Sequence, residues 1–306
     1  MSARNTQAGA AVVTALLITA LGVLLVSGAF VRQAVVVRQV ENAAESSQAR
    51  WLLAGAVDWV RVILREDART TAVDHVGEPW ATPLGRTRLD NGTREPAWLS
   101  GRVEDAQSRF NLRSLSSPGG VPPDDLSVLR RLLALTGSSG VDAERLAQRL
   151  RAAMVIPRSG ATPILLGTLE DIVLTDAADV DALQRLKPFV TLLPMATPIN
   201  VNTASAEVIA ARFPELSLSD ARGLVESRDR TVFRDLQDFQ ARLPGLKLAG
   251  LGDATVSSRM FLLDGLIEHG RARLAVRVLM QRVGDRVAVL WQRDDLPVPA
   301  PAGGLG

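Results

Sequence analysis

The chain has 306 residues and contains no cysteine, no tyrosine and only two histidines. The missing cysteine excludes disulfide bonds, thiol nucleophiles and zinc sites built on thiolates. Because tyrosine is absent and histidine is scarce, few side chains could act as a general acid or base. The composition therefore argues against most enzyme classes, and the chain could reside in an oxidising compartment without depending on disulfides.

A strong excess of one charge sign is also absent, since 35 Lys and Arg residues face 33 Asp and Glu residues, a formal net charge of +2. The only lysines are Lys187 and Lys247, so the pI near 9.8 reflects arginine. A net-basic nucleic-acid-binding protein is not indicated. With 47% hydrophobic residues, the chain can bury a core in one large domain or two modest ones, which excludes disorder of the whole chain.

The strongest signal is a long apolar run at the N-terminus. No charged residue lies between Arg4 and Arg32, and the run from Ala8 to Val31 is long enough for the roughly 20 residues that cross a bilayer. The first proline of the chain is Pro79. We therefore predict one helix over residues 10–67, about 58 residues long, whose first half spans a membrane.

The second half of this predicted helix is amphipathic. Charged residues become frequent after Arg32, while apolar residues continue at helical spacing at Trp51, Gly55, Trp59, Val62 and Ile63. This spacing predicts that the stripe faces a folded body, with both tryptophans packed in its core.

Two cleavage sites are compatible with this terminus. Ser27-Gly28-Ala29 has the small-residue pattern of a signal peptidase site, and cleavage there would release a protein that starts at Phe30. Alternatively, a short polar leader ends at Gly9, and cleavage after it leaves a mature chain that starts at Ala10 and keeps the span. The charges that flank the span do not decide its orientation.

The leader glycine, the apolar helix and its amphipathic continuation resemble a type IV pilin-like prepilin. The segments that follow resemble one family, the minor pseudopilin K of type II secretion systems, also called general secretion pathway protein K. Each matching segment is short, but their order and spacing are specific and run nearly end to end. They are residues 48–51, 55–56 with Trp59, 66–67, 74–81, 101–105, 109–112, 198–204 and 256–261.

This resemblance implies cleavage between Gly9 and Ala10 by a prepilin peptidase, with methylation of the new N-terminus. Most pilin-like proteins carry a glutamate at the fifth mature position, but the resembled family lacks it and this chain has Thr14 there. A carboxylate inside the bilayer costs about 2.5 kcal/mol or more unless it is paired, and only a subunit with a neighbour ahead of it gains that partner. Thr14 therefore suits a subunit at the tip of a filament.

The rest of the chain alternates between strand and helix signals. Residues 70–112 predict loops and short strands, with a turn at Asp90-Asn91-Gly92, and a Ser/Pro/Gly linker covers residues 114–123. Helices are predicted to start at Asp124, Asp142 and Thr168 or Asp171, and to continue to Leu186. Strand-like alternation returns from Thr255 to Leu290, with a hairpin at Gly284-Asp285.

We therefore predict an α+β fold in which a long N-terminal helix packs on a small antiparallel sheet, pilin-like and interrupted by a large all-α insertion. The predicted units are a leader (1–9), a transmembrane segment (10–31), the first part of the pilin-like body (32–112), the α-helical insertion (113–250), the returning strands (251–293) and a disordered tail (294–306).

One segment of the insertion suggests another function. Residues 199–239 resemble a helix-hairpin-helix DNA-binding element, with Asn202-Thr203 capping one helix and Ser217 and Asp220 forming a capping box for the next. The hairpin at residues 213–218 contains a proline and Glu215 but no glycine, so it could not cradle a phosphate on backbone N–H groups. A scaffold role is favoured over DNA binding.

Metal and catalytic signals are weak. His75 lies three residues before Glu78, but the flanking Gly77 and Pro79 predict a loop rather than a helix that would align the pair, and His269 falls in a predicted loop. The resemblance implies calcium near the helical insertion, yet residues 148–154 carry arginines where the family has acids. We expect no other cofactor and assign no metal ligand, although acids elsewhere could serve: Glu170, Asp171, Asp176, Asp179 and Asp181.

The predicted function is that of a non-enzymatic minor pseudopilin that caps and initiates a periplasmic pseudopilus for protein export across the outer membrane. The resemblance implies a single-pass protein of the bacterial inner membrane, with its N-terminus in the cytoplasm and its bulk in the periplasm. Implied partners are the I-type and J-type minor pseudopilins, the major pseudopilin and the prepilin peptidase. The alternatives are a membrane-anchored helix-hairpin-helix DNA-binding module and an enzyme secreted after cleavage before Phe30.

Overall fold

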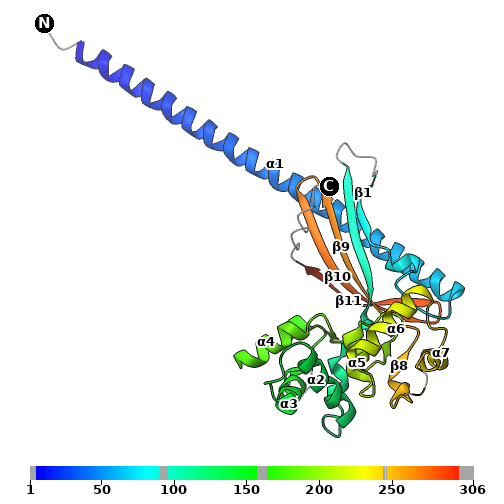
Figure 1. Ribbon diagram of the computed structural model, residues 1–306. Helices are drawn as coiled ribbons and strands as arrows, with labels where there is room; N and C mark the ends of the chain where they lie inside the picture. The colour runs from blue at the N-terminus through cyan, green and yellow to red at the C-terminus, as the bar shows by residue number, and fades with distance from the viewer. Residues whose placement is uncertain (1–4, 90–95, 157–163, 244, 246, 296–306) are drawn as a thin grey trace.

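The computed structural model describes residues 5–89, 96–156, 164–243, 245 and 247–295. A single helix, α1 (Asn5–Thr70, 66 residues), projects far beyond a body that has two parts (Figure 1). The predicted long helix is confirmed, and it extends a few residues further at both ends than expected. The turn predicted at residues 90–92 lies outside the described residues, as do residues 1–4 of the predicted leader.

The first part of the body is a five-stranded antiparallel sheet with strand order β1-β2-β9-β10-β11. Two strands precede the helical region and three follow it, so the predicted interruption of the sheet is confirmed. Gly270 and Gly284 have positive φ at the two tight turns that join the last three strands. The strands are β1 (Leu84–Leu89), β2 (Ala97–Asp105), β9 (Met260–His269), β10 (Ala272–Val283) and β11 (Arg286–Asp295).

The boundary predicted for the C-terminal tail is wrong by two residues. Asp294 and Asp295 belong to β11, where they pair with Val276 and Ala275 of β10. Backbone pairing with a neighbouring strand holds these acidic residues in the sheet, although their side chains are typical of a solvated end. The remaining residues of the predicted tail, 296–306, lie outside the described residues.

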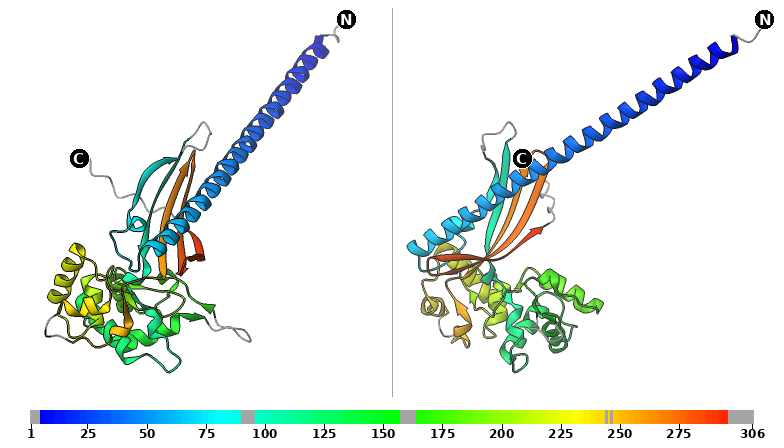
Figure 2. Two further views of the ribbon diagram at one scale, coloured as in Figure 1. Left: turned by 90° about the vertical axis from the view of Figure 1, so that its right-hand side faces the viewer. Right: turned by 180° about the vertical axis from the view of Figure 1, so that it is seen from behind.

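The second part of the body lies at the end of the sheet remote from the N-terminus, and α1 runs along one face of the sheet (Figure 2). Its helices are α2 (Pro123–Leu135), α3 (Ala143–Ala153), α4 (Ala177–Leu186), α5 (Ala206–Arg212), α6 (Leu218–Arg230) and α7 (Leu236–Ala241). Polar side chains at Asp142, Asp176, Ser205, Ser217 and Asp235 accept bonds from the first-turn N–H groups of α3 to α7.

Short elements accompany these helices, so the insertion is mainly rather than purely helical. Its strand pairs are β3 (Phe110–Asn111) with β6 (Val190–Thr191), β4 (Val155–Ile156) with β5 (Ile164–Leu165), and β7 (Ile199–Asn200) with β8 (Ala254–Thr255). Single 3-10 turns cover Pro79–Ala81, Ala106–Ser108, Leu112–Leu115, Leu169–Asp171 and Leu251–Asp253. The helix predicted to begin at Thr168 or Asp171 is only such a turn, and α4 begins later.

The sheet part and the helical part each have hydrophobic cores of their own. In the sheet part, α1 packs on strand residues such as Phe261, Ile267 and Val278. The helical part has one core around Leu129, Leu146 and Leu186 and another around Phe213, Phe233 and Phe239. Each fully buried Leu or Phe contributes about 1.5–3 kcal/mol, so each part has its own apolar stabilisation.

Two local predictions are wrong. Asn202 does not cap a helix, because Ser205 is the N-cap of α5, and Asn202 instead bonds both the N–H and the C=O of Phe233 at 2.9 Å. His269 is not in a loop but at the end of β9, where it is buried with its Nε2 3.1 Å from Gln48 Oε1 on α1. The predicted capping box of Ser217 and Asp220 is confirmed.

Candidate functional site

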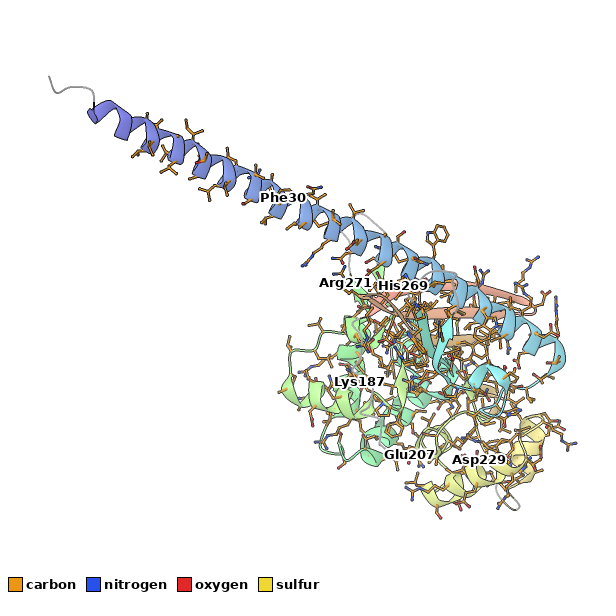
Figure 3. All side chains as sticks on the ribbon, turned by 90° about the horizontal axis from the view of Figure 1, so that it is seen from above. Phe30, Lys187, Glu207, Asp229, His269 and Arg271 are labelled. Carbon is orange, nitrogen blue, oxygen red and sulfur yellow. The ribbon has the colours of Figure 1, made fainter. Side chains whose placement is uncertain are left out.

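The first half of α1 is an exposed apolar rod. Its large apolar side chains between Val12 and Val40 are 49–70% exposed, and Figure 3 shows Phe30 on the part that projects from the body. An 18-residue stretch of this helix has a mean hydropathy of 2.4 and no buried residue. The helix is therefore long and apolar enough to cross a membrane.

The second half of α1 has two apolar faces, and only one of them packs on the sheet. Every third or fourth residue is buried, namely Ala49, Leu53, Val57, Val60 and Leu64. On the other face Trp51 is 77% exposed, Val62 53% and Trp59 51%. The prediction that the tryptophans pack in the core is therefore wrong, because both faces repeat at helical spacing and the sequence does not say which one meets the sheet.

Gly55 lies on the same exposed face as Trp51 and Val62, since residues 51, 55 and 62 are separated by four and seven positions. A Cβ placed on Gly55 would meet no atom within 4 Å. A polar stretch, residues 41–50, separates this exposed face from the apolar rod. Unpartnered tryptophan and valine on a helix are typical of a protein interaction surface rather than of a solvated face.

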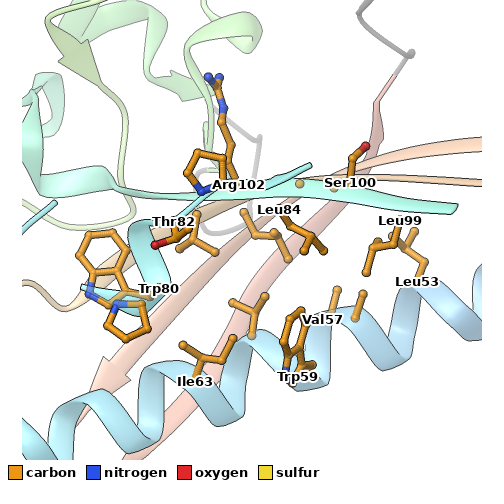
Figure 4. Close-up of a pocket in the computed structure, with 18 residues that line it drawn as sticks. Leu53, Val57, Trp59, Ile63, Trp80, Thr82, Leu84, Leu99, Ser100 and Arg102 are labelled. Carbon is orange, nitrogen blue, oxygen red and sulfur yellow. The ribbon is translucent and has the colours of Figure 1, made fainter. Parts of the chain in front are cut away.

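An apolar groove flanks this face. It lies between α1 and the β1–β2 pair and has a volume of about 300 Å³. Its lining is mainly apolar, with Leu53, Val57, Trp59 and Ile63 from the helix facing Trp80, Leu84 and Leu99 (Figure 4). Trp59 thus belongs both to the groove and to the exposed side of α1.

The residues predicted for processing lie at the N-terminal end of α1. Gly9 and Ala10 are helical, and Thr14 is an exposed residue on the same helix. Ser27-Gly28-Ala29, the alternative cleavage site, lies in the middle of the uninterrupted helix. The cleavage positions and the role of Thr14 remain predictions.

The carbonyl oxygens of the hairpin in the helix-hairpin-helix segment are bonded by a side chain from another helix. Arg131 of α2 donates to the carbonyl oxygens of Ala210, Pro214 and Leu216 at 3.0, 3.2 and 2.8 Å. Glu215 accepts a bond from the N–H of Ala249 at 3.1 Å. Because this turn is tied into the helical part and carries an acidic residue, its geometry opposes binding of a phosphate backbone.

His75 and Glu78 do come together, but in a structural arrangement. His75 Nδ1 accepts from the N–H of Gly77 at 3.1 Å, and its Nε2 lies 3.9 Å from Glu78 Oε1. Glu78 Oε2 accepts from Trp80 Nε1 at 2.8 Å and from the N–H of His75 at 3.0 Å. These bonds shape the segment before β1 and include no nucleophile.

The segment where the resemblance implies calcium, residues 148–154, carries an arginine that is paired with two acids. Arg149 of α3 bonds Asp176 at 3.0 Å and also bonds Asp179. Calcium requires six to eight oxygen ligands, and here a guanidinium neutralises the two nearest of the candidate acids. The side chains present at this position do not fit calcium.

A long apolar N-terminal helix whose second half packs on an antiparallel sheet defines a pilin-like protein. A family model described as type II secretion system protein K matches residues 199–257. The type II secretion system protein K of Pseudomonas aeruginosa is 30% identical over 330 aligned residues, which cover 98% of this chain and 97% of that protein. The protein K of Pectobacterium carotovorum is 26% identical, with coverages of 95% and 97%.

Among solved structures, a chain in the GspK-GspI-GspJ complex of enterotoxigenic Escherichia coli has the same fold, with a TM-score of 0.66 and 22% identity over 85% of this chain and 100% of that one. The chain belongs to the type II secretion system protein K family. It is a minor pseudopilin and takes part in protein secretion. The family is one of structural pseudopilins rather than known enzymes, and α1 fits a membrane anchor.

Proposed function

We propose that this minor pseudopilin caps and initiates the pseudopilus, and that α1 is its assembly device. The observation that carries the proposal is the exposed apolar surface of α1, which consists of the rod from Val12 to Val40 and, beyond the polar stretch 41–50, of Trp51, Trp59 and Val62. Tryptophans that project from an ordered helix are typical anchors of protein interfaces. A neighbouring helix that covers this face would also place its side chains in the adjoining groove.

The chemistry of the span supports a position at the tip. Thr14 occupies the position where most pilin-like subunits carry a glutamate, so this chain brings no carboxylate into the bilayer. A subunit without the acid needs no partner ahead of it. The remaining subunits can then follow below it, and the long helix keeps all of its backbone groups bonded as it leaves the lipid.

The related chain of Escherichia coli was solved in a complex with GspI and GspJ. We propose that the corresponding partners of this chain are an I-type and a J-type minor pseudopilin, followed by the major pseudopilin. We further propose cleavage after Gly9, an N-terminus in the cytoplasm, and a periplasmic body in which residues 113–250 form the unit added to a pilin-like core. No catalytic step is required for this role.

The test replaces exposed apolar side chains in the full-length chain. Truncation of a tryptophan anchor costs about 2 kcal/mol or more, which lowers affinity roughly 30-fold. We therefore expect Trp51→Ser and Trp59→Ser to reduce both co-purification with the I-type and J-type subunits and secretion. Val173→Ser is the matched control, because Val173 is also 77% exposed but lies in the helical part. Equal effects of all three changes would refute the assignment of this face.

Mass spectrometry of the mature chain from membranes tests the processing proposal independently. We expect a start at methylated Ala10. A start at Phe30 would remove the span and with it the assembly role, and it would support the secreted alternative. Thermal unfolding at increasing calcium concentration tests whether the group of Arg149, Asp176 and Asp179 binds calcium. We expect no rise in Tm.

A further inference from the structure

Segments from five places in the chain meet where the helical part joins the sheet and α1. They contribute six buried polar residues, which together are Asp67 from α1, Asp74 after it, Asp105 at the end of β2, Asn200 from β7, Ser258 after β8 and Arg282 from β10. Asn200 is completely buried, and each of the others is at most 8% exposed. This junction is a hydrogen-bonded cluster enclosed by protein.

Arg282 is the centre of one half of the junction. Its guanidinium donates to Asp67 at 2.7 Å, to Asp74 at 2.5 Å and to the carbonyl oxygens of Leu64 and Ser258 at 3.3 and 3.2 Å. The last residues of α1 are therefore tied to β10. Charge-assisted bonds of this kind are the strongest in proteins.

Asp105 is the centre of the other half and receives donors from the helical part. Its carboxylate accepts from Asn200 Nδ2 at 3.0 Å, from Thr203 Oγ1 at 2.5 Å and from Ser258 Oγ at 2.6 Å. It also accepts from the N–H of Gln107 at 2.7 Å. Asn200 Nδ2 donates in addition to the C=O of Asp74 at 3.0 Å. The two halves are thus one continuous network.

The charges at this junction do not balance. Asp67, Asp74, Glu78 and Asp105 are buried carboxyl groups, whereas Arg282 is the buried cation among the described residues that face them. One oxygen of Asp67, one of Asp74 and one of Glu78 lie within 4.8 Å of one another. Glu78 Oε1 is buried without a hydrogen-bond partner in the described structure. Asn200, Thr203 and Ser258 are neutral, and Arg259, which follows Ser258, is exposed.

His75 is the other titratable group at this place, with its Nε2 3.9 Å from Glu78 Oε1. It is a cation only when protonated. When buried carboxyl groups outnumber the cations that can pair with them, a carboxyl group stays protonated. Burial is the main cause that raises the pKa of Asp67 to about 6 and that of Asp105 to about 6, and it also raises the pKa of Asp74.

We propose that this junction is a proton-dependent latch, in which a proton held among the buried carboxyl groups of Asp67, Asp74 and Asp105 stabilises the attachment of the helical part to the sheet and α1. Loss of that proton leaves three uncompensated negative charges inside the protein, and the network then opens more readily. The direction follows from linkage: carboxyl groups that bind protons more tightly in the folded state make it less stable as the pH rises from about 4 through about 6.

The test is hydrogen exchange of the full-length chain in detergent at pH 5 and pH 8, corrected for the intrinsic exchange rate. For wild type we expect residues 199–205 and 256–259 to open at least tenfold more often at pH 8. A carboxyl pKa about two units above its ordinary value changes such an equilibrium by up to roughly 100-fold. Equal opening at both pH values would overturn the proposal.

Variants identify the groups that hold the proton. Asp67→Asn keeps an acceptor for Arg282, and Glu78→Gln keeps an acceptor for Trp80. Each variant removes one negative charge, so we expect each to reduce the ratio of opening at pH 8 to opening at pH 5 at least threefold. Glu66→Gln is the matched control, since Glu66 is an exposed neighbour in α1, and it should leave the effect unchanged. Loss of the effect in His75→Gln would assign the proton to the imidazole and overturn the proposal. Suppression of opening by millimolar calcium at pH 8 would show that a cation takes its place and would overturn it as well.

Discussion

Replacement of Arg282 by methionine tests the central contact of the junction. The change removes the buried cation that bonds Asp67, Asp74 and two carbonyl oxygens, and that lies 4.7 Å from the ring of Phe261. Breaking a buried ion pair from one side costs about 3–5 kcal/mol, because the other charges stay buried without a partner. For a body of this size we expect Tm to fall by roughly 6–20 °C.

The assay is thermal unfolding of the full-length chain in detergent, followed by circular dichroism at pH 8 and pH 5. The loss should be smaller at pH 5, since the abandoned carboxyl groups can then bind protons. Arg282→Lys keeps the charge but loses the planar fork, so it should recover only part of the stability. Arg286→Met is the control, because Arg286 is exposed, and surface substitutions of this kind change stability by about 0.5 kcal/mol or less. If Arg282→Met lowers Tm no more than Arg286→Met does, Arg282 does not stabilise the junction.

Other positions give sharper local predictions. Asn202→Ala leaves the buried N–H and C=O of Phe233 without partners and should cost about 2–4 kcal/mol in urea unfolding; a cost below 1 kcal/mol would contradict the bonding described here. Gly101→Ala places a Cβ 2.8 Å from the C=O of Asp264 on the neighbouring strand and should cost about 1–3 kcal/mol. The control is Gly85→Ala on β1, where a Cβ meets no atom within 4 Å, and unchanged stability of both variants would mean that β2 and β9 are not so close.

Local sequence signals were sufficient where the structure depends on neighbours along the chain. An uncharged run without proline defines the membrane-spanning part of α1, and Ser217 with Asp220 three residues later defines the start of α6. Alternating apolar residues on both sides of the helical region indicated a divided sheet. Periods of 3.6 and 2 residues arise within a single element, so they can be recognised without knowledge of the fold.

Periodicity alone could not predict which of the two apolar faces of α1 packs on the sheet. Residues 51, 55, 59 and 62 and residues 53, 57, 60 and 64 have equally good helical spacing. Only the position of the sheet determines that Leu53 and Val57 are buried while Trp51 is exposed. His269 and Asn202 were misjudged for a related reason, because their partners Gln48 and Phe233 are distant in sequence.

The short segments that resemble the pseudopilin K family include five residues that meet at the junction, namely Asp67, Asp74, Asp105, Asn200 and Ser258. Their order along the chain was visible, but their common location was not, and Arg282 lies outside all of those segments. The amino-acid sequence alone determined that the chain has a helix long and apolar enough to span a membrane, a divided sheet and a helical insertion, since these depend on local periodicity and composition. Tertiary structure decided which helix face remains free for partners and which charges are buried together, because both depend on contacts between residues distant in the sequence, such as Arg282 with Asp67, 215 positions away, and His269 with Gln48, 221 positions away.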